Sequence, residues 1–114
     1  MLIEATLVEG VAILCLSGDL DAPASADMRE VVQGRLLAGD GCVVLDLNGV
    51  EHMYTAGILV LSELQRVAAG KGCRLICCGA RPFVRELLRI TMLDFELDLQ
   101  MDLESALKVS RQAS

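Results

Sequence analysis

Residues 42–47 read CVVLDL, an apolar run with one late charge, and residues 73–78 read CRLICC, a second apolar run with one early charge. Apolar runs of this length are typical of strands buried on both faces of a parallel sheet. Apolar residues recur at helical spacing between the two runs: Ile58, Leu61, Leu64, Val67 and Ala68. This spacing predicts a helix that ends at Gly70-Lys71-Gly72. We therefore predict two parallel strands joined by a right-handed helical crossover.

The residues before this unit predict a hairpin followed by a helix. Residues 2–8 and 11–17 are apolar-rich and are separated by Glu9-Gly10, a two-residue gap typical of a β-hairpin. Asp21 is a suitable helix cap, and Pro23 is tolerated only in a first turn. The apolar side of the predicted helix comprises Met28, Val31, Val32 and Leu36.

The residues after the first buried run contain fewer signals. Residues 50–56 read as a connecting segment, and Pro82 opens a third helix with an apolar side of Phe83, Leu87, Leu88 and Ile90. Residues 95–99 suggest a short last strand, and Asp102 caps a final helix. We expect one α/β domain over residues 1–110, with a mixed sheet, about four helices and a frayed tail at residues 111–114.

Composition excludes several functional classes. The net charge of −6 argues against nucleic acid, which needs a basic face. No window approaches the roughly 18 apolar residues of a membrane helix, and no secretory signal pattern is present, so we expect a cytoplasmic protein without membrane insertion. The five cysteines form no C-x-x-C pair and His52 is the one histidine, so we expect reduced, buried thiols, no metal and no cofactor.

Four blocks in register resemble one family. They are Leu16-Ser17-Gly18-Asp19-Leu20-Asp21, Val44-Leu45-Asp46-Leu47-Asn48-Gly49-Val50, Met53-Tyr54-Thr55-Ala56-Gly57-Ile58, and the stretch from Gly79 to Asp94 that contains Pro82-Phe83-Val84-Arg85-Glu86-Leu87-Leu88. Together they resemble a STAS domain of the anti-sigma factor antagonist (anti-anti-sigma factor) type. The resemblance implies a STAS-like fold in a bacterial, non-enzymatic signalling module that regulates transcription.

In this family the loop before the second helix carries a serine that a partner anti-sigma factor/serine kinase phosphorylates. The usual aspartate of that loop is Tyr54 here, and the usual acceptor serine is Ala56. Only Thr55 retains a hydroxyl. The resemblance therefore implies docking on such a kinase through this loop, with the phosphorylation switch either absent or moved to Thr55.

Two residues of this loop have alternative interpretations. Thr55 either caps a helix that begins near Ala56 or Gly57, or it is the phospho-acceptor. Tyr54 is either a half-buried loop filler or an aromatic anchor at the centre of a docking face.

Asp19 reads as a turn residue and Asp21 as a helix cap, in a loop that the resemblance places beside the partner site. His52 lacks a clearly paired nucleophile, so we predict no catalytic residue. The predicted partner-binding residues are Asp19, Asp21, His52, Met53, Tyr54, Thr55, Ala56, Gly57 and Ile58.

Two other binding functions remain open. Small STAS subunits of lipid-transport ABC complexes carry a loop similar to Thr55-Ala56-Gly57, which would make an ABC ATPase subunit the partner. A scaffold subunit of a large stress-signalling assembly is the other. An enzyme is disfavoured, because the sequence has no phosphate-binding glycine loop, dinucleotide fingerprint or metal cluster.

Overall fold

The computed structural model describes residues 1–112. In chain order the elements are β1 (Leu2–Val8), β2 (Val11–Leu20), α1 (Ala22–Leu37), β3 (Cys42–Met53), α2 (Thr55–Gly70), β4 (Arg74–Cys78), α3 (Pro82–Ile90), α4 (Leu93–Glu96), β5 (Asp98–Gln100) and α5 (Leu103–Gln112). The tail expected at residues 111–114 overlaps the last turn of α5, and residues 113–114 lie outside the described part. Among the described helices, none is long and apolar enough to cross a bilayer.

The predicted hairpin is confirmed. Strands β1 and β2 pair antiparallel from Leu2 opposite Ser17 to Val8 opposite Val11. Glu9 and Gly10 both have positive φ, at 53° and 81°, which is the backbone of the type I′ turn favoured by two-residue hairpins. Gly10 accepts this conformation without steric cost.

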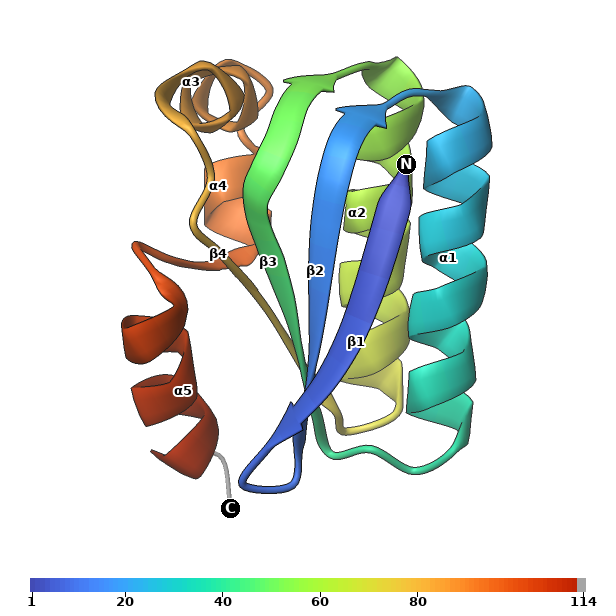
Figure 1. The fold of residues 1–114 in the computed structure, drawn as a ribbon, viewed down its shortest axis with the longest axis vertical. Coiled ribbons are helices and arrows are strands. Elements are labelled where there is room, and N and C mark those ends of the chain that lie inside the picture. The colour runs from blue at the N-terminus through green and yellow to red at the C-terminus, as the bar shows by residue number, and fades with distance from the viewer. Residues whose placement is uncertain (113–114) are drawn as a thin grey trace.

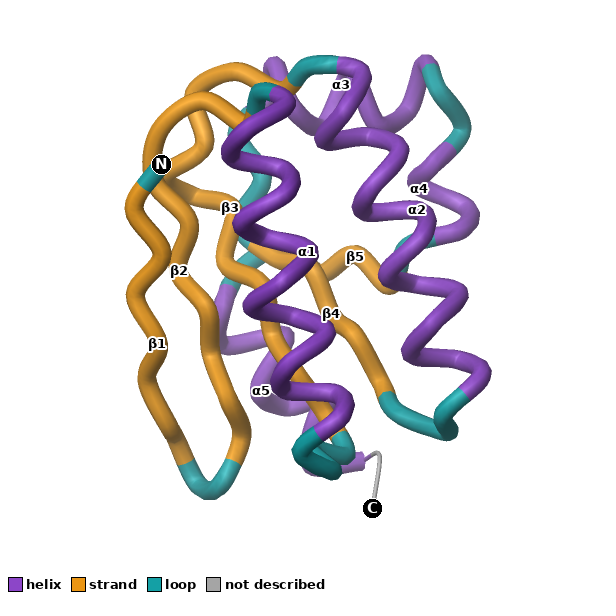
Figure 2. Tube along the Cα trace, turned by 90° about the vertical axis from the view of Figure 1, so that its right-hand side faces the viewer, coloured by secondary structure: helices purple, strands orange, loops and turns teal. Residues whose placement is uncertain are grey.

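The sheet is mixed, as expected, and its strands lie in chain order from β1 to β5. Every neighbouring pair after the first is parallel. Figures 1 and 2 show α1 and α2 side by side on one face of the sheet, with α5 on the other face. The parallel strands therefore all end at the same edge, where the loops to α1, α2 and α3 begin.

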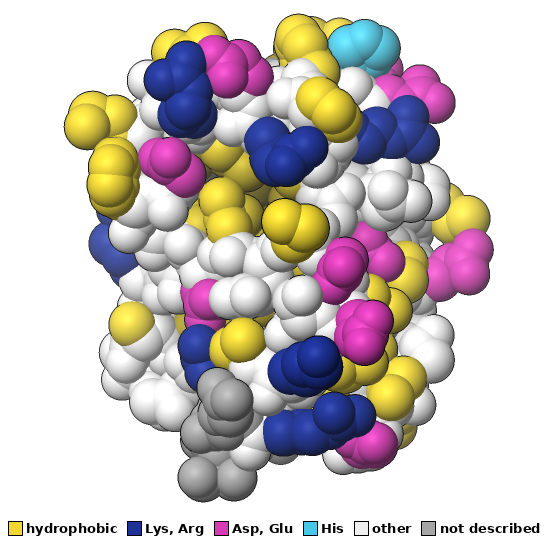
Figure 3. Space-filling model, turned by 90° about the vertical axis from the view of Figure 1, so that its left-hand side faces the viewer, with side chains coloured by type: hydrophobic (Ala, Val, Ile, Leu, Met, Phe, Trp, Pro, Cys, Tyr) yellow, Lys and Arg dark blue, Asp and Glu magenta, His cyan; other side chains and the backbone are white. Residues whose placement is uncertain are grey.

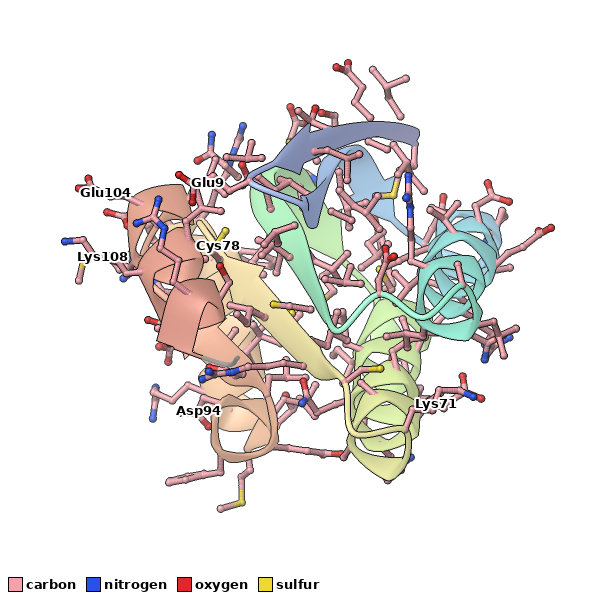
Figure 4. The ribbon with its side chains drawn as sticks, turned by 90° about the horizontal axis from the view of Figure 1, so that it is seen from below. Glu9, Lys71, Cys78, Asp94, Glu104 and Lys108 are labelled. Carbon is pink, nitrogen blue, oxygen red and sulfur yellow. The ribbon has the colours of Figure 1, made fainter. Side chains whose placement is uncertain are left out.

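Both faces of the central strands are buried. The larger cluster packs sheet residues such as Leu14, Leu45 and Leu75 against α1 and α2. The smaller cluster lies under α5 and comprises Ile13, Val44, Ile76, Cys78 and Ala106. Figure 4 shows Cys78 on the sheet beside α5, with Glu104 and Lys108 on the outer side of that helix. Burial on both faces explains why residues 42–47 and 73–78 are so apolar.

Three side chains form a row across the α5 face of the sheet. Cys15 pairs in register with Asp46, and Asp46 with Cys78. The Cys15 thiol lies 4.0 Å from Asp46 Oδ2. Burial, then the Asp46 charge, raises the pKa of Cys15, and the same causes raise the pKa of Cys78 to about 12. Cys77 and Cys78 are buried, whereas Cys15, Cys42 and Cys73 are partly exposed.

The first difference from the sequence prediction concerns residues 50–56, which were expected to connect β3 and α2. Strand β3 instead continues to Met53, and β2 continues to Leu20. The two strands keep pairing past Asn48-Gly49 because the register shifts twice, and it ends with Leu20 opposite Met53. Gly49 fits this shift closely, since a Cβ there would lie 2.5 Å from Leu16 O.

Further differences lie near α3. The last strand begins at Asp98 rather than Phe95, because Leu93–Glu96 forms the short helix α4 after Met92 takes a left-handed φ of 62°. Two residues of the predicted apolar side of α3, Phe83 and Ile90, are exposed, and the buried ones are Val84 and Leu88. In α1, Val31 lies outside the buried stripe.

Candidate functional site

Two helices begin side by side at the ends of neighbouring parallel strands. Helix α1 follows β2 and helix α2 follows β3, and the backbone N–H of Tyr54 donates to Leu20 O at 3.2 Å. Both starting residues, Asp21 and Tyr54, have extended backbone, with φ of −87° and −105°. The two starts therefore share a backbone geometry and differ in their side chains.

The start of α1 is closed, in the sense that most of its backbone N–H groups are bonded within the chain. Asp21 Oδ1 accepts the N–H of Ala24 at 3.0 Å, which confirms the predicted cap. Ser25 donates its hydroxyl to Asp21 O at 2.6 Å, and its backbone N–H bonds the same oxygen. Pro23 has no N–H to satisfy. The first turn of α1 thus satisfies most of its own donors.

The start of α2 is open. The cap position is Tyr54, whose side chain makes no capping hydrogen bond. The interpretation of Thr55 as the cap is wrong, because the helix begins at Thr55 itself. Within residues 1–112 no acceptor receives the backbone N–H of Thr55 or Ala56, and the Thr55 hydroxyl makes no hydrogen bond. These donors meet solvent at the positive end of the helix dipole.

Gly57 holds this open start against the sheet. It is buried in the first turn of α2, and a Cβ there would lie 2.8 Å from Leu20 Cγ and 3.1 Å from Leu20 O. Because Leu20 is fully buried, it has no room to withdraw. The glycine therefore sets how closely the start of α2 approaches the end of β2.

A cluster of exposed side chains lies beside the two helix starts. His52 Nδ1 is 3.0 Å from Asp19 Oδ1, and the His52 ring meets the Phe83 ring edge-on at 6.0 Å. Glu51 adds a second carboxylate, and the ligand atoms of Asp19, Glu51 and His52 lie within 4.8 Å of one another. Figure 3 shows the histidine side chain in cyan at the top of the molecule, next to acidic and basic side chains.

The predicted partner-binding residues fall into three groups by exposure. Those on the surface are Asp19, Asp21, His52, Tyr54 and Thr55. Ala56 and Ile58 are partly buried. Met53, at 5 % exposure, and Gly57 are buried. The structure thus places all of these residues at one end of the molecule, although only the first group is fully available to a partner.

Sequence reasoning missed Phe83. Helical spacing predicts Phe83 on the apolar side of α3, yet it is 60 % exposed and contacts His52. Tyr54 exposes 52 % of its surface, so about half of it is available to a partner and the rest packs against the protein. A usable signal was the position of Phe83 directly after Pro82, in the first turn of a helix that starts from the same edge of the sheet.

The groups at this end could bind an anion and pack against an apolar surface. Free N–H groups at the start of α2 can bond a carboxylate or a phosphate, and a phosphate on Thr55 would lie next to them. Exposed tyrosine and phenylalanine rings supply the apolar contact area common at the centres of interfaces. The imidazole of His52 faces a carboxylate and an aromatic ring, with no nucleophile beside it in the described residues.

Comparisons with known proteins identify the family of this fold. The profile of the STAS domain family matches residues 3–106. BtrV of Bordetella bronchiseptica, named as a candidate anti-sigma factor antagonist, is 27 % identical in an alignment 88 residues long that covers 74 % of this chain and 72 % of BtrV.

Two solved structures have the same fold. A candidate anti-sigma factor antagonist from Thermotoga maritima has a TM-score of 0.88 at 19 % identity, with 96 % of this chain and 94 % of that chain covered. The phosphorylated form of the Bacillus cell fate determinant SpoIIAA has a TM-score of 0.72 at 15 % identity, with 95 % and 99 % covered.

Proposed function

The chain belongs to the STAS domain family, and from this premise we propose that it is an anti-sigma factor antagonist that docks on an anti-sigma factor/serine kinase through the start of α2. The observation that carries the proposal is the open start of α2, where Tyr54 is exposed and the N–H groups of Thr55 and Ala56 have no acceptor in the described residues. Relatives and similar folds that bear the antagonist name support the partner class.

In this proposal Tyr54 is the apolar anchor and Phe83 extends its surface. Met53 and Gly57 are buried, so they position the loop from beneath and do not touch the partner. The domain performs no chemistry of its own. Because sigma factors and their kinases act in the bacterial cytoplasm, we place the protein there as well.

Regulation depends on Thr55. SpoIIAA exists in a phosphorylated form, so phosphate is compatible with this fold. Here Ala56 has no hydroxyl, and the exposed Thr55 hydroxyl is free. A phosphate on Thr55 would add about −1.5 to −2 charges to the docking surface and so release the partner. Without this modification the protein would remain permanently in its binding form.

The partner class is tested by affinity purification of the tagged protein from its own cells, with the captured proteins identified by mass spectrometry. We expect a kinase-fold anti-sigma factor. Recovery of an ABC ATPase subunit, or of a large stress-signalling assembly, would replace the proposed function with one of the two other STAS roles.

The docking surface is then tested with purified partner and the variant Tyr54→Ala. Loss of an aromatic anchor should weaken binding by roughly 30-fold, equivalent to about 2 kcal/mol. Leu37→Ala is the matched control, because Leu37 is a large apolar residue that is even more exposed, at the far end of α1. Equal affinities for the two variants in isothermal titration calorimetry would exclude Tyr54 as an anchor.

The switch is tested by comparing Thr55→Glu with Thr55→Gln, which have the same shape and differ in charge. If phosphate at Thr55 releases the partner, Glu should weaken binding by about tenfold relative to Gln, since like charge or lost contacts at an interface cost about 1–2 kcal/mol. Intact mass after incubation with the kinase and ATP, with Thr55→Val as control, identifies the acceptor. A phosphate that persists on Thr55→Val would contradict the assignment.

A further inference from the structure

Strand β1 is an open edge of the sheet. It pairs only with β2, and no strand or helix covers its outer side in residues 1–112. Figures 2 and 4 show it as the outermost strand. Two large apolar side chains of this strand are well exposed, Leu2 at 56 % and Leu7 at 64 %. Such an edge offers a row of backbone donors and acceptors to another strand.

The register defines which residues of β1 offer these groups. Val8 and Val11 flank the two-residue turn, so they form a hydrogen-bonded pair, and bonded and non-bonded pairs alternate from there. Leu2, Glu4, Thr6 and Val8 therefore bond inward to β2. The groups that point outward belong to Ile3, Ala5 and Leu7.

We propose that β1 pairs antiparallel with β1 of a second copy of this chain, with the two-fold axis at Ala5. This register places Ala5 opposite Ala5 and Ile3 opposite Leu7, so the three outward-pointing residues of each copy become the hydrogen-bonded pairs. Every free N–H and C=O of the edge then has a partner. A two-fold interface requires such self-complementarity, since the same patch serves both copies.

The side chains also favour the register centred on Ala5, because apolar residues of the two copies become neighbours. Ile3 of one copy lies beside Leu7 of the other on the α1 face, and Leu2 lies beside Val8 on the α5 face. Glu4 lies beside Thr6, so no like charges meet. A register centred on Glu4 would also bring outward-pointing residues together, Ile3 with Ala5, but it would oppose two glutamates.

The edge also lacks the usual protections against pairing. Residues 2–8 contain one charge, Glu4, and neither lysine nor proline. The irregular register of this sheet lies between β2 and β3 and not in β1. A two-strand interface is smaller than the standard interface of about 1,600 Å², so we expect a weak, reversible dimer with a Kd between about 1 µM and 1 mM.

Amide hydrogen exchange of the full chain, followed by NMR at low and high protein concentration, tests the pairing residue by residue. The amides of Glu4 and Thr6 should be protected at every concentration, because they bond β2. The amides of Ile3, Ala5 and Leu7 should gain protection only at high concentration. A dimer that leaves these three amides in fast exchange, or a chain that stays monomeric at about 1 mM in sedimentation, would overturn the proposal.

A matched charge pair at Thr6 tests the register. Thr6→Lys would place lysine beside Glu4 of the other copy, twice per dimer, and should tighten the dimer by roughly 2- to 30-fold. Thr6→Glu would oppose glutamates and should weaken it by a similar factor. Both changes are at Thr6, whose side chain is exposed, and circular dichroism verifies that each variant is folded. Equal shifts, or shifts in the reverse order, would exclude this register.

Discussion

Helices α1 and α2 begin at the same edge of the sheet, one strand apart, with the same extended backbone at their first flanking residue. Asp21 closes the first by accepting the N–H of Ala24, while Tyr54 leaves the second open. A cap contributes about 1 kcal/mol, so the open start lacks stability that its neighbour has. The donors of α2 therefore stay available beside the exposed side chain of Tyr54, whereas most of those of α1 are bonded within the chain.

Among changes at the two helix starts, Gly57→Ala should lower the free energy of unfolding most. The added Cβ would push the start of α2 away from the end of β2. The added Cβ meets buried Leu20 at 2.8 Å, and overpacking of this kind destabilises by about 1–3 kcal/mol. Gly70→Ala is the control in the same helix, because a Cβ there has open space. Chemical denaturation should show a lower free energy of unfolding for Gly57→Ala and an unchanged one for Gly70→Ala. Similar values for both variants would mean that the close approach of Gly57 to Leu20 is unimportant for stability.

The second-largest loss of stability should come from Asp21→Ala, which would remove the cap of α1. Loss of the bond to Ala24 should lower the free energy of unfolding by about 1 kcal/mol. Asp21→Asn is the control, since asparagine keeps a capping oxygen and should restore most of the stability. If the two variants unfold at the same urea concentration, the Asp21 side chain does not cap α1.

The smallest change in stability should come from Tyr54→Asp, which would give α2 a capping aspartate like that of α1. Relative to Tyr54→Ala, which also removes the ring, aspartate should add about 0.5–1 kcal/mol of stability because the backbone at residue 54 already matches that of a capped start. Partner binding should be weak in both variants. An aspartate variant no more stable than the alanine variant would show that the open start is not a missing cap.

Local signals in the sequence predicted a large part of this fold. The Glu9-Gly10 hairpin, the Asp21 cap and the two doubly buried strands are confirmed, because each depends on residues within a few positions of one another. The family resemblance supplied the STAS fold, which the match to residues 3–106 confirms.

What could not be predicted depends on contacts between distant segments. Strand β3 continues to Met53 only because β2 shifts register and continues beside it, and neither strand signals this alone. That extension moved the start of α2 to Thr55 and so excluded threonine as its cap. The exposure of Phe83 likewise depends on where α3 lies relative to His52, 31 positions earlier, which no spacing of apolar residues reveals.

The row of Cys15, Asp46 and Cys78 places two thiols beside one carboxylate. Peroxides react with the thiolate form of cysteine, and reactivity falls as the thiolate becomes scarce. Burial and the Asp46 carboxylate raise the pKa of Cys15 and raise that of Cys78 to about 12, so both sulfurs remain protonated at neutral pH. We therefore expect peroxide to oxidise these two sulfurs at the centre of the sheet slowly.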